Sequence, residues 1–136
     1  MKLQTGIYRH FKGDLYFVER LVTNAQTDRP MVVYHALYPR HPGEETAFCR
    51  EFSDFKIMIP DGQNNTVQRF SLINVISPKK MPMFLPGSRV IDKISSTEYR
   101  VVEWKNGNSL SVSLESAHSK TEQVLIDFLT HFELAE

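Results

Sequence analysis

Apolar side chains recur at every second position along much of this 136-residue chain. In residues 110–114 apolar and polar residues alternate without a break, which predicts a strand with one face in water. Asn106-Gly107, just before this segment, is typical of a hairpin turn. Further β-branched and aromatic segments, separated by turn residues, predict strands at 15–22, 31–38, 56–59, 67–73, 87–93 and 98–104. The chain is therefore expected to form a mostly β protein, built as a small sheet or barrel.

Two segments depart from this alternation. Residues 125–132 place Leu125, Phe128, Leu129 and Phe132 at helical spacing, so we expect a strand near 122–126 and a helical turn at about 127–132. Residues 77–86 contain three prolines, which argue against a helix and break a central strand. We predict a proline-rich linker there, packed rather than loose because it also carries apolar side chains. It divides the chain into residues 1–76 and 87–136.

The second part resembles the first in plan. Gly6 aligns with Gly87 and Tyr16 with Tyr99 when gaps are allowed, so residues 87–136 are interpreted as a second small β unit and a degenerate repeat. The alternative is one extended β domain with packed halves.

Composition limits the classes of function. The 16 basic and 16 acidic residues cancel, which argues against binding long duplex DNA mainly through its phosphates. The single cysteine, Cys49, excludes an internal disulfide, and its apolar neighbours predict a buried thiol. The N-terminal residues lack the apolar run of a signal peptide, and no apolar stretch approaches the length of a membrane span. We therefore expect a cytoplasmic protein without a membrane partner.

Common catalytic and metal-binding motifs are missing. The five histidines show neither a His-x-x-x-His spacing nor a cysteine pair, and the glycine-rich phosphate loops and the Gly-x-Ser-x-Gly elbow are absent. The sequence therefore indicates no catalytic residue, no metal and no cofactor, and we expect the protein not to be an enzyme.

Several motifs in the first half carry a family resemblance. They are Gly6-Ile7-Tyr8-Arg9-His10-Phe11-Lys12-Gly13, Tyr16 with Val18, Val32 to Tyr38, Phe55, and Arg69-Phe70. Over residues 4–73 they resemble a bacterial family called domain of unknown function 1653. The chain departs from the family pattern at Asn24-Ala25-Gln26-Thr27 and at Phe48-Cys49-Arg50-Glu51. The resemblance implies a small SH3-like β-barrel, an origin in bacteria or phage, and no established activity. With the second half, it predicts two SH3-like barrel units in tandem with short helical turns.

The opening motif supplies three candidate binding residues, Tyr8, Arg9 and His10. On a strand Tyr8 and His10 share one face, while Arg9 lies on the other. An arginine beside aromatic rings suits a carboxylate or phosphate ligand. The structural alternative is that Arg9 pairs with Asp14 or Glu19.

Four other residues complete the candidate set. Tyr34 and Tyr38 lie four positions apart on one strand face, and they either bind a partner or line a core edge with wet hydroxyl groups. Trp104, beside the Asn-Gly turn, either anchors the second unit or stays exposed for a partner. Arg50, with Arg9 and His10, is the third candidate for a small-ligand pocket.

These observations favour a non-enzymatic binding or adaptor module that engages a protein partner through an aromatic and basic surface, as a monomer or a homodimer. One alternative is a nucleic-acid-binding tandem barrel, in which aromatic rings stack on bases. The other is a protein that binds or sequesters a small ligand.

Overall fold

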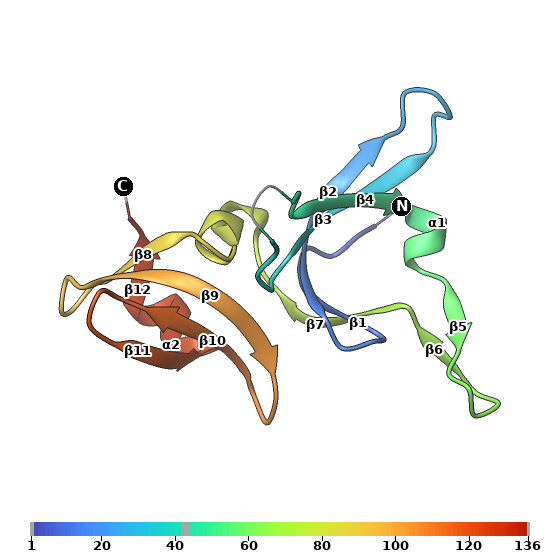
Figure 1. Cartoon of the computed structure of the whole chain (residues 1–136). Coiled ribbons are helices and arrows are strands. Elements are labelled where there is room, and N and C mark those ends of the chain that lie inside the picture. The colour runs from blue at the N-terminus through green and yellow to red at the C-terminus, as the bar shows by residue number, and fades with distance from the viewer. Residues whose placement is uncertain (1, 42–43, 136) are drawn as a thin grey trace.

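The computed structural model describes residues 2–41 and 44–135. It contains two five-stranded antiparallel sheets, one from each half of the chain, which lie side by side (Figure 1). The first sheet has the strand order β4-β3-β2-β1-β7, and its strands are β1 (Gly6–His10), β2 (Leu15–Thr23), β3 (Pro30–Ala36), β4 (Ala47–Glu51) and β7 (Phe70–Val75). Between β4 and β7 the chain forms the short helix α1 (Phe52–Phe55) and a separate hairpin of β5 (Met58–Pro60) and β6 (Thr66–Gln68).

The second sheet repeats this order. Its strands run β11-β10-β9-β8-β12, where β8 is Arg89–Asp92, β9 is Glu98–Asn106, β10 is Leu110–Glu115, β11 is Lys120–Val124 and β12 is Phe132–Leu134. Helix α2 (Leu125–His131) comes immediately before the last strand, as α1 comes before β5 in the first half. In both halves the first strand is therefore flanked by the second and the last.

The prediction of a mostly β protein is confirmed, and the predicted strands are present with shifted ends. Strand β4 was not predicted, and the expected strand at 67–73 is broken at Arg69, where the chain passes from β6 to β7. The expected closed barrels are not seen, because within the described residues each sheet remains open and no strand pairing joins β4 to β7.

The proline-rich segment is helical, contrary to the sequence expectation. Pro78–Met83 forms the 3-10 helix η1, whose first residue is a proline and thus needs no backbone N–H donor. The Ser77 hydroxyl oxygen accepts a hydrogen bond from the Lys79 backbone N–H at 3.2 Å and caps this helix. Phe84 follows, with none of its side chain exposed. The end of the linker, at Met83 and Phe84, is therefore part of the interior.

The first sheet has a buried cluster on each face. Because strand side chains alternate, Tyr8, Tyr16 and Val18 contribute to a cluster that belongs to the first half alone. Their neighbours Ile7, Leu15 and Phe17 point to the opposite face, where they join a larger cluster shared with the second half. Each large apolar side chain buried there contributes about 1.5–3 kcal/mol. The second half thus covers one face of the first sheet.

Trp104 lies at the contact between the halves and is 3% exposed. Its indole N–H donates to the Phe84 carbonyl oxygen at 2.8 Å, and its backbone N–H donates to the Leu37 carbonyl oxygen at 3.0 Å. Of the two roles considered for Trp104, the structure places it in the core, so its side chain is not on an exposed partner surface.

Candidate binding site: an aromatic and basic face on the first sheet

Tyr16 of β2 lies at the centre of a group of aromatic rings. Edge-to-face contacts join its ring to those of Tyr34 at 5.2 Å, Tyr38 at 5.7 Å, Phe70 at 5.9 Å, Phe48 at 6.0 Å and His10 at 6.5 Å between centroids. We call these six residues the aromatic face. They come from β1, β2, β3, β4 and β7 and from the residues just after β3. Edge-to-face pairs of this kind each contribute about 0.5–1.5 kcal/mol beyond their area.

The strand register explains why these rings meet. Tyr34 lies opposite Phe48, and His10 lies opposite Phe70, in neighbouring strands. Tyr34 and Phe70 are buried, whereas His10, Tyr16, Tyr38 and Phe48 are only half-buried. The aromatic face therefore has a buried floor and an accessible rim.

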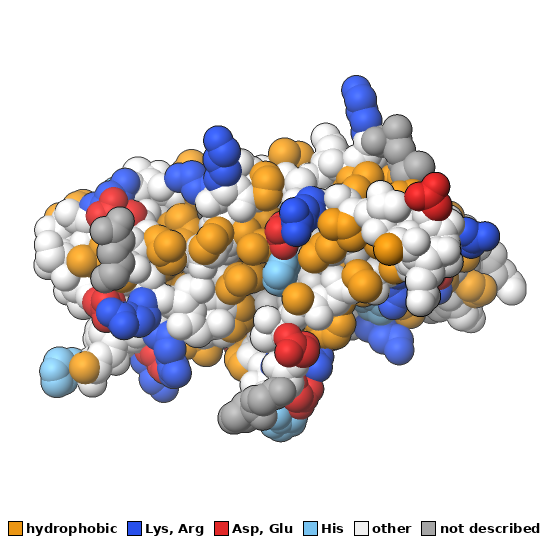
Figure 2. All heavy atoms as spheres, turned by 90° about the horizontal axis from the view of Figure 1, so that it is seen from above, with side chains coloured by type: hydrophobic (Ala, Val, Ile, Leu, Met, Phe, Trp, Pro, Cys, Tyr) orange, Lys and Arg blue, Asp and Glu red, His pale blue; other side chains and the backbone are white. Residues whose placement is uncertain are grey.

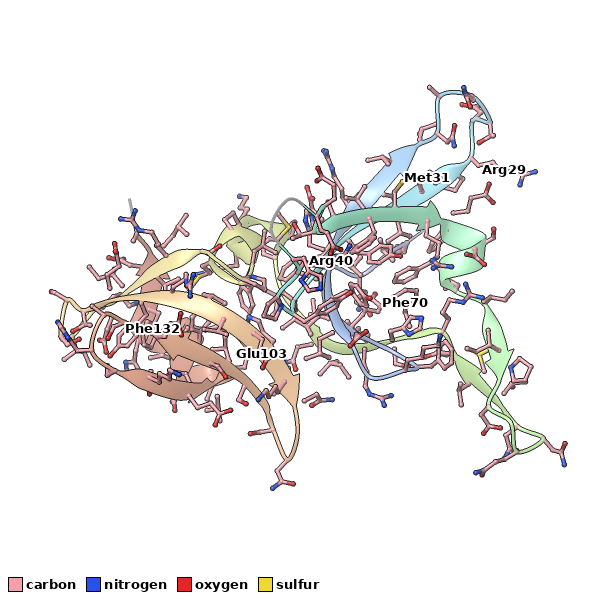
Figure 3. All side chains as sticks on the ribbon, in the orientation of Figure 1. Arg29, Met31, Arg40, Phe70, Glu103 and Phe132 are labelled. Atoms are coloured by element: carbon pink, nitrogen blue, oxygen red, sulfur yellow. The ribbon has the colours of Figure 1, made fainter. Side chains whose placement is uncertain are left out.

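Arginine side chains surround the rings. The Arg50 guanidinium lies 5.8 Å from the Phe70 centroid, and its Nε donates to the Tyr34 hydroxyl at 3.4 Å. The Arg40 guanidinium lies 5.1 Å from the Phe48 centroid, and Arg40 and Phe70 are both labelled in Figure 3 among the aromatic side chains of the first half. These distances suit cation–π contacts, so the arginines extend the aromatic face with positive charge.

One carboxylate connects the two edges of the first sheet. Asp54 Oδ2 accepts from Arg50 Nη1 at 2.6 Å and from Arg69 Nη1 at 3.4 Å. Arg50 belongs to β4, and Arg69 immediately precedes β7. This ion triad therefore stands where backbone pairing would otherwise close the sheet.

Positive charge exceeds negative charge at this face. Among the described residues, three arginines, Arg40, Arg50 and Arg69, share two carboxylates, those of Asp54 and Glu44. Arg40 Nη2 contacts Glu44 Oε2 at 2.7 Å. Within the described residues, the buried Nε atoms of Arg40 and Arg69 have no hydrogen-bond partner. A site with surplus cations and unused donors suits an anionic group.

The pKa values of His10 and Tyr16 are both shifted toward the neutral form of the side chain. Burial lowers the pKa of His10 from 6.5, and the nearby charges of Arg50, Lys12 and Arg69 lower it further, against the opposite effect of Asp14. Burial raises the pKa of Tyr16, as does its hydrogen bond with the Tyr38 hydroxyl at 3.0 Å. The positive charge of the face therefore comes from its arginines.

The structure brings four of the seven predicted residues together: His10, Tyr34, Tyr38 and Arg50. Tyr8 shares the His10 side of β1, as predicted, but is buried in the floor of the first half, where its hydroxyl donates to the Gln4 carbonyl oxygen at 2.6 Å. Trp104 lies in the shared core, away from this face.

Arg9 does not belong to the site. It lies opposite Leu15, on the face of β1 that also carries Ile7, and it is exposed. Within residues 2–41 and 44–135 it makes no ion pair, so the expected pairing with Asp14 or Glu19 is not found. Glu19 instead contacts Arg20 at 3.4 Å and His35 at 2.7 Å.

The site also contains residues that were not predicted from the sequence, among them Arg40, Phe48, Asp54 and Arg69. One usable signal was the spacing of Arg50 and Asp54, four residues apart across the start of α1. Cys49, expected to be buried, is exposed. The reason is the alternation of the edge strand β4, which turns Phe48 and Arg50 toward the aromatic face and Cys49 away from it.

Comparisons with known proteins identify the first half. Residues 6–72, just under half of the chain, match the family described as Protein of unknown function (DUF1653). The first half of the chain is therefore similar to that family, as its motifs indicated. A crystal structure of a DUF1653 protein from Bordetella bronchiseptica is 28% identical, with a TM-score of 0.49, over 57% of this chain and 95% of that one. No curated protein matches the chain. Among its described residues, no helix is both long and apolar enough to cross a membrane.

Proposed function

We propose that this chain is a non-enzymatic binding or adaptor protein, and that the aromatic face of its first half engages a protein partner. The observation that carries the proposal is the combination of half-exposed rings with surplus arginine charge at the open side of the first sheet. Tyrosine and arginine are enriched among the residues that dominate binding energy in protein interfaces. The rings are held by mutual contacts, so little side-chain freedom would be lost on binding.

The two faces of the first sheet differ in availability. One face, which carries Ile7 and Phe17, is covered by Phe84 of the connecting segment and by the second half. The other carries the aromatic face, whose rim is accessible. This difference supports the proposal that the second half stabilises the first sheet, whereas the aromatic face of the first half binds the partner.

The finer description of the fold belongs to the same proposal. We interpret each half as an SH3-like unit and the second as a degenerate repeat of the first. The support is the shared strand order, the helix that follows the fourth strand in each half, and a positive-φ glycine near the start of each first strand, Gly6 and Gly87. We also place the protein in the cytoplasm of a bacterium or in a phage-infected cell, as a monomer or homodimer.

Nucleic acid is the second candidate partner, because arginines beside exposed rings also suit single strands. The balanced net charge disfavours it. On the side of the molecule that Figure 2 shows, basic side chains are scattered among acidic and hydrophobic ones rather than gathered in a stripe. We do not propose the small-ligand pocket of Arg9, His10 and Arg50, because Arg9 lies on the other face of β1.

Partner capture from the native host tests the proposal. Nuclease-treated lysate is passed over immobilised wild-type protein, Arg50→Gln, Phe48→Ala, and the control Arg89→Gln, whose side chain is exposed in the second half. We expect a protein that is retained by wild type and Arg89→Gln and lost with both face variants. Equal retention by all four proteins would contradict the role of the aromatic face. Retention that is seen with untreated lysate, is lost after nuclease treatment and falls steeply with salt would favour the second candidate.

A further inference from the structure

A groove of about 230 Å³ lies beside the aromatic face and shares Phe70 with it. Its apolar wall is formed by Tyr8, Phe52, Phe55, Phe70 and Leu72, which come from β1, α1 and β7. The rings of Phe55 and Phe70 are stacked with their centroids 4.3 Å apart, and Tyr8 meets Phe55 edge-on at 5.5 Å. These contacts fix the wall in place before any ligand arrives.

The charged residues at the rim of the groove are all positive. Lys2 precedes β1 and Lys56 follows α1, and neither Asp nor Glu is among the described residues that line the groove. The Lys56 ammonium lies 5.2 Å from the Phe52 centroid, so this positive charge is held at the edge of the apolar wall. Both lysine side chains are exposed.

The size of the groove limits its occupant. Pockets for drug-sized ligands measure about 300–1,000 Å³, so this groove is too small for most of them and suits a single large apolar side chain. The lysines would then meet carboxylates that flank that side chain. Charge complementarity thus points to a protein segment rather than to a free small molecule.

We propose that this groove binds a segment of a protein partner in which a Leu or Phe side chain stands between acidic residues. The inference rests on the proposed function, since it extends the contact surface for a protein partner from the aromatic face to the groove. It adds the chemistry of the recognised segment, namely one apolar anchor between carboxylates.

Fluorescence anisotropy with the full-length chain tests this inference. The probe is a short fluorescein-labelled peptide with a central Leu-Phe pair between runs of Glu, and the comparison peptide replaces each Glu with Lys. We expect saturable binding of the acidic probe only. Charge reversal in Lys56→Glu or Lys2→Glu should weaken binding roughly tenfold, while Lys79→Glu, with the same change in net charge on exposed η1, should leave it unchanged.

A second variant addresses the apolar part of the site. Gln68→Trp places a large side chain at the groove from an exposed position of β6 and should abolish binding without disturbing the core. Binding that is unaffected by Lys2→Glu, Lys56→Glu and Gln68→Trp would overturn the groove inference, as would equal binding of the Lys-containing peptide. Tighter binding to anionic lipid vesicles than to the acidic peptide would overturn it too.

The two proposals are separable. If Arg50→Gln and Phe48→Ala lose the native partner while the groove variants keep both the partner and the peptide, the groove inference fails and the aromatic face stands. If the groove variants lose both the peptide and the partner while the face variants keep both, the groove stands and the aromatic face fails.

Discussion

The ring of Trp104 stacks on that of Phe84 with centroids 4.9 Å apart, and its indole N–H donates to the Phe84 carbonyl oxygen. Phe84 also touches Phe17 of the first sheet at 5.5 Å and Phe128 of α2 at 5.5 Å between centroids. One residue of the connecting segment therefore contacts both halves of the chain.

Phe84→Ala should destabilise the whole chain by about 3–5 kcal/mol, because it leaves a cavity at the shared core. Trp104→Phe should cost less, about 1–3 kcal/mol, since a ring remains but the Phe84 carbonyl loses its donor. Denaturant unfolding followed by tryptophan fluorescence measures the first and circular dichroism measures both. A midpoint for Phe84→Ala equal to that of wild type would contradict the arrangement.

Separate expression of residues 1–78 and 82–136 should yield fragments that are each less stable than the intact chain. The first fragment would expose the face of β1 and β2 that carries Ile7, Leu15 and Phe17, all at most 4% exposed in the whole chain. We expect it to bind a hydrophobic dye and to melt at a lower temperature. Two fragment transitions that coincide with those of the intact chain would show that the halves are independent.

Arg9→Ala should change the free energy of unfolding by no more than about 0.5 kcal/mol, because the Arg9 side chain is exposed and makes no ion pair with the described residues. Asp54→Ala should cost more, about 1 kcal/mol, because it leaves Arg50 and Arg69 facing each other without their shared carboxylate. Parallel urea titrations compare the two variants. A larger loss of unfolding free energy for Arg9→Ala than for Asp54→Ala would contradict this prediction and would favour the pairing of Arg9 with Asp14 or Glu19.

His10 should make the chain less stable below neutral pH. Its pKa is lower in the folded chain than the ordinary 6.5, so the unfolded chain binds the proton more readily. The stabilisation that neutral His10 provides is therefore complete above about pH 6.5 and is lost as the pH falls below that value.

His10→Gln removes this dependence. Between about pH 7.5 and about pH 5, the wild-type unfolding midpoint should fall further than that of His10→Gln. His118→Gln, an exposed substitution in the β10–β11 turn, serves as the control and should follow wild type. Identical pH profiles for all three proteins would rule out a contribution from His10.

Gly6→Ala should be far more damaging than Gly87→Ala, although both glycines have positive φ angles, +136° and +90°. A Cβ at Gly6 would lie 2.0 Å from the Asn74 carbonyl oxygen, whereas a Cβ at Gly87 would meet nothing within 4 Å. We expect about 1–3 kcal/mol of backbone strain at Gly87 and an added steric cost at Gly6. Thermal unfolding compares them, and equal losses would argue against the close approach of β1 and β7.

The local parts of the fold were predictable because they depend on alternation and turn chemistry. The hairpin at Asn106 and the face shared by Tyr8 and His10 follow from neighbouring residues alone. Strand β4 escaped prediction because Ala47–Glu51 is short and ends in two adjacent charged residues, Arg50 and Glu51, so it shows no alternation of apolar and polar residues. η1 escaped because proline is tolerated in the first turn of a helix.

The site was predictable only in part, because it depends on contacts between distant segments. Tyr34 and Arg50 were identified from residue type, but the role of Asp54 appears only when β4 and β7 approach each other. The position of Trp104 likewise depends on Phe84, which lies 20 residues earlier in the chain. No periodicity in the sequence reports such a pairing.

Because Phe84 packs between the two halves, the connecting segment holds them together through side-chain contacts as well as through the backbone. A single protease cut between the exposed residues Lys79 and Lys80 would leave this ring in its seat, attached to the second fragment. The two fragments of the cleaved chain should then stay associated and elute together in size-exclusion chromatography until a denaturant separates them. For the same reason, insertions should be tolerated at the exposed hairpin turns. An insertion between Ile76 and Val90 would displace Phe84 and would require the shared core to repack.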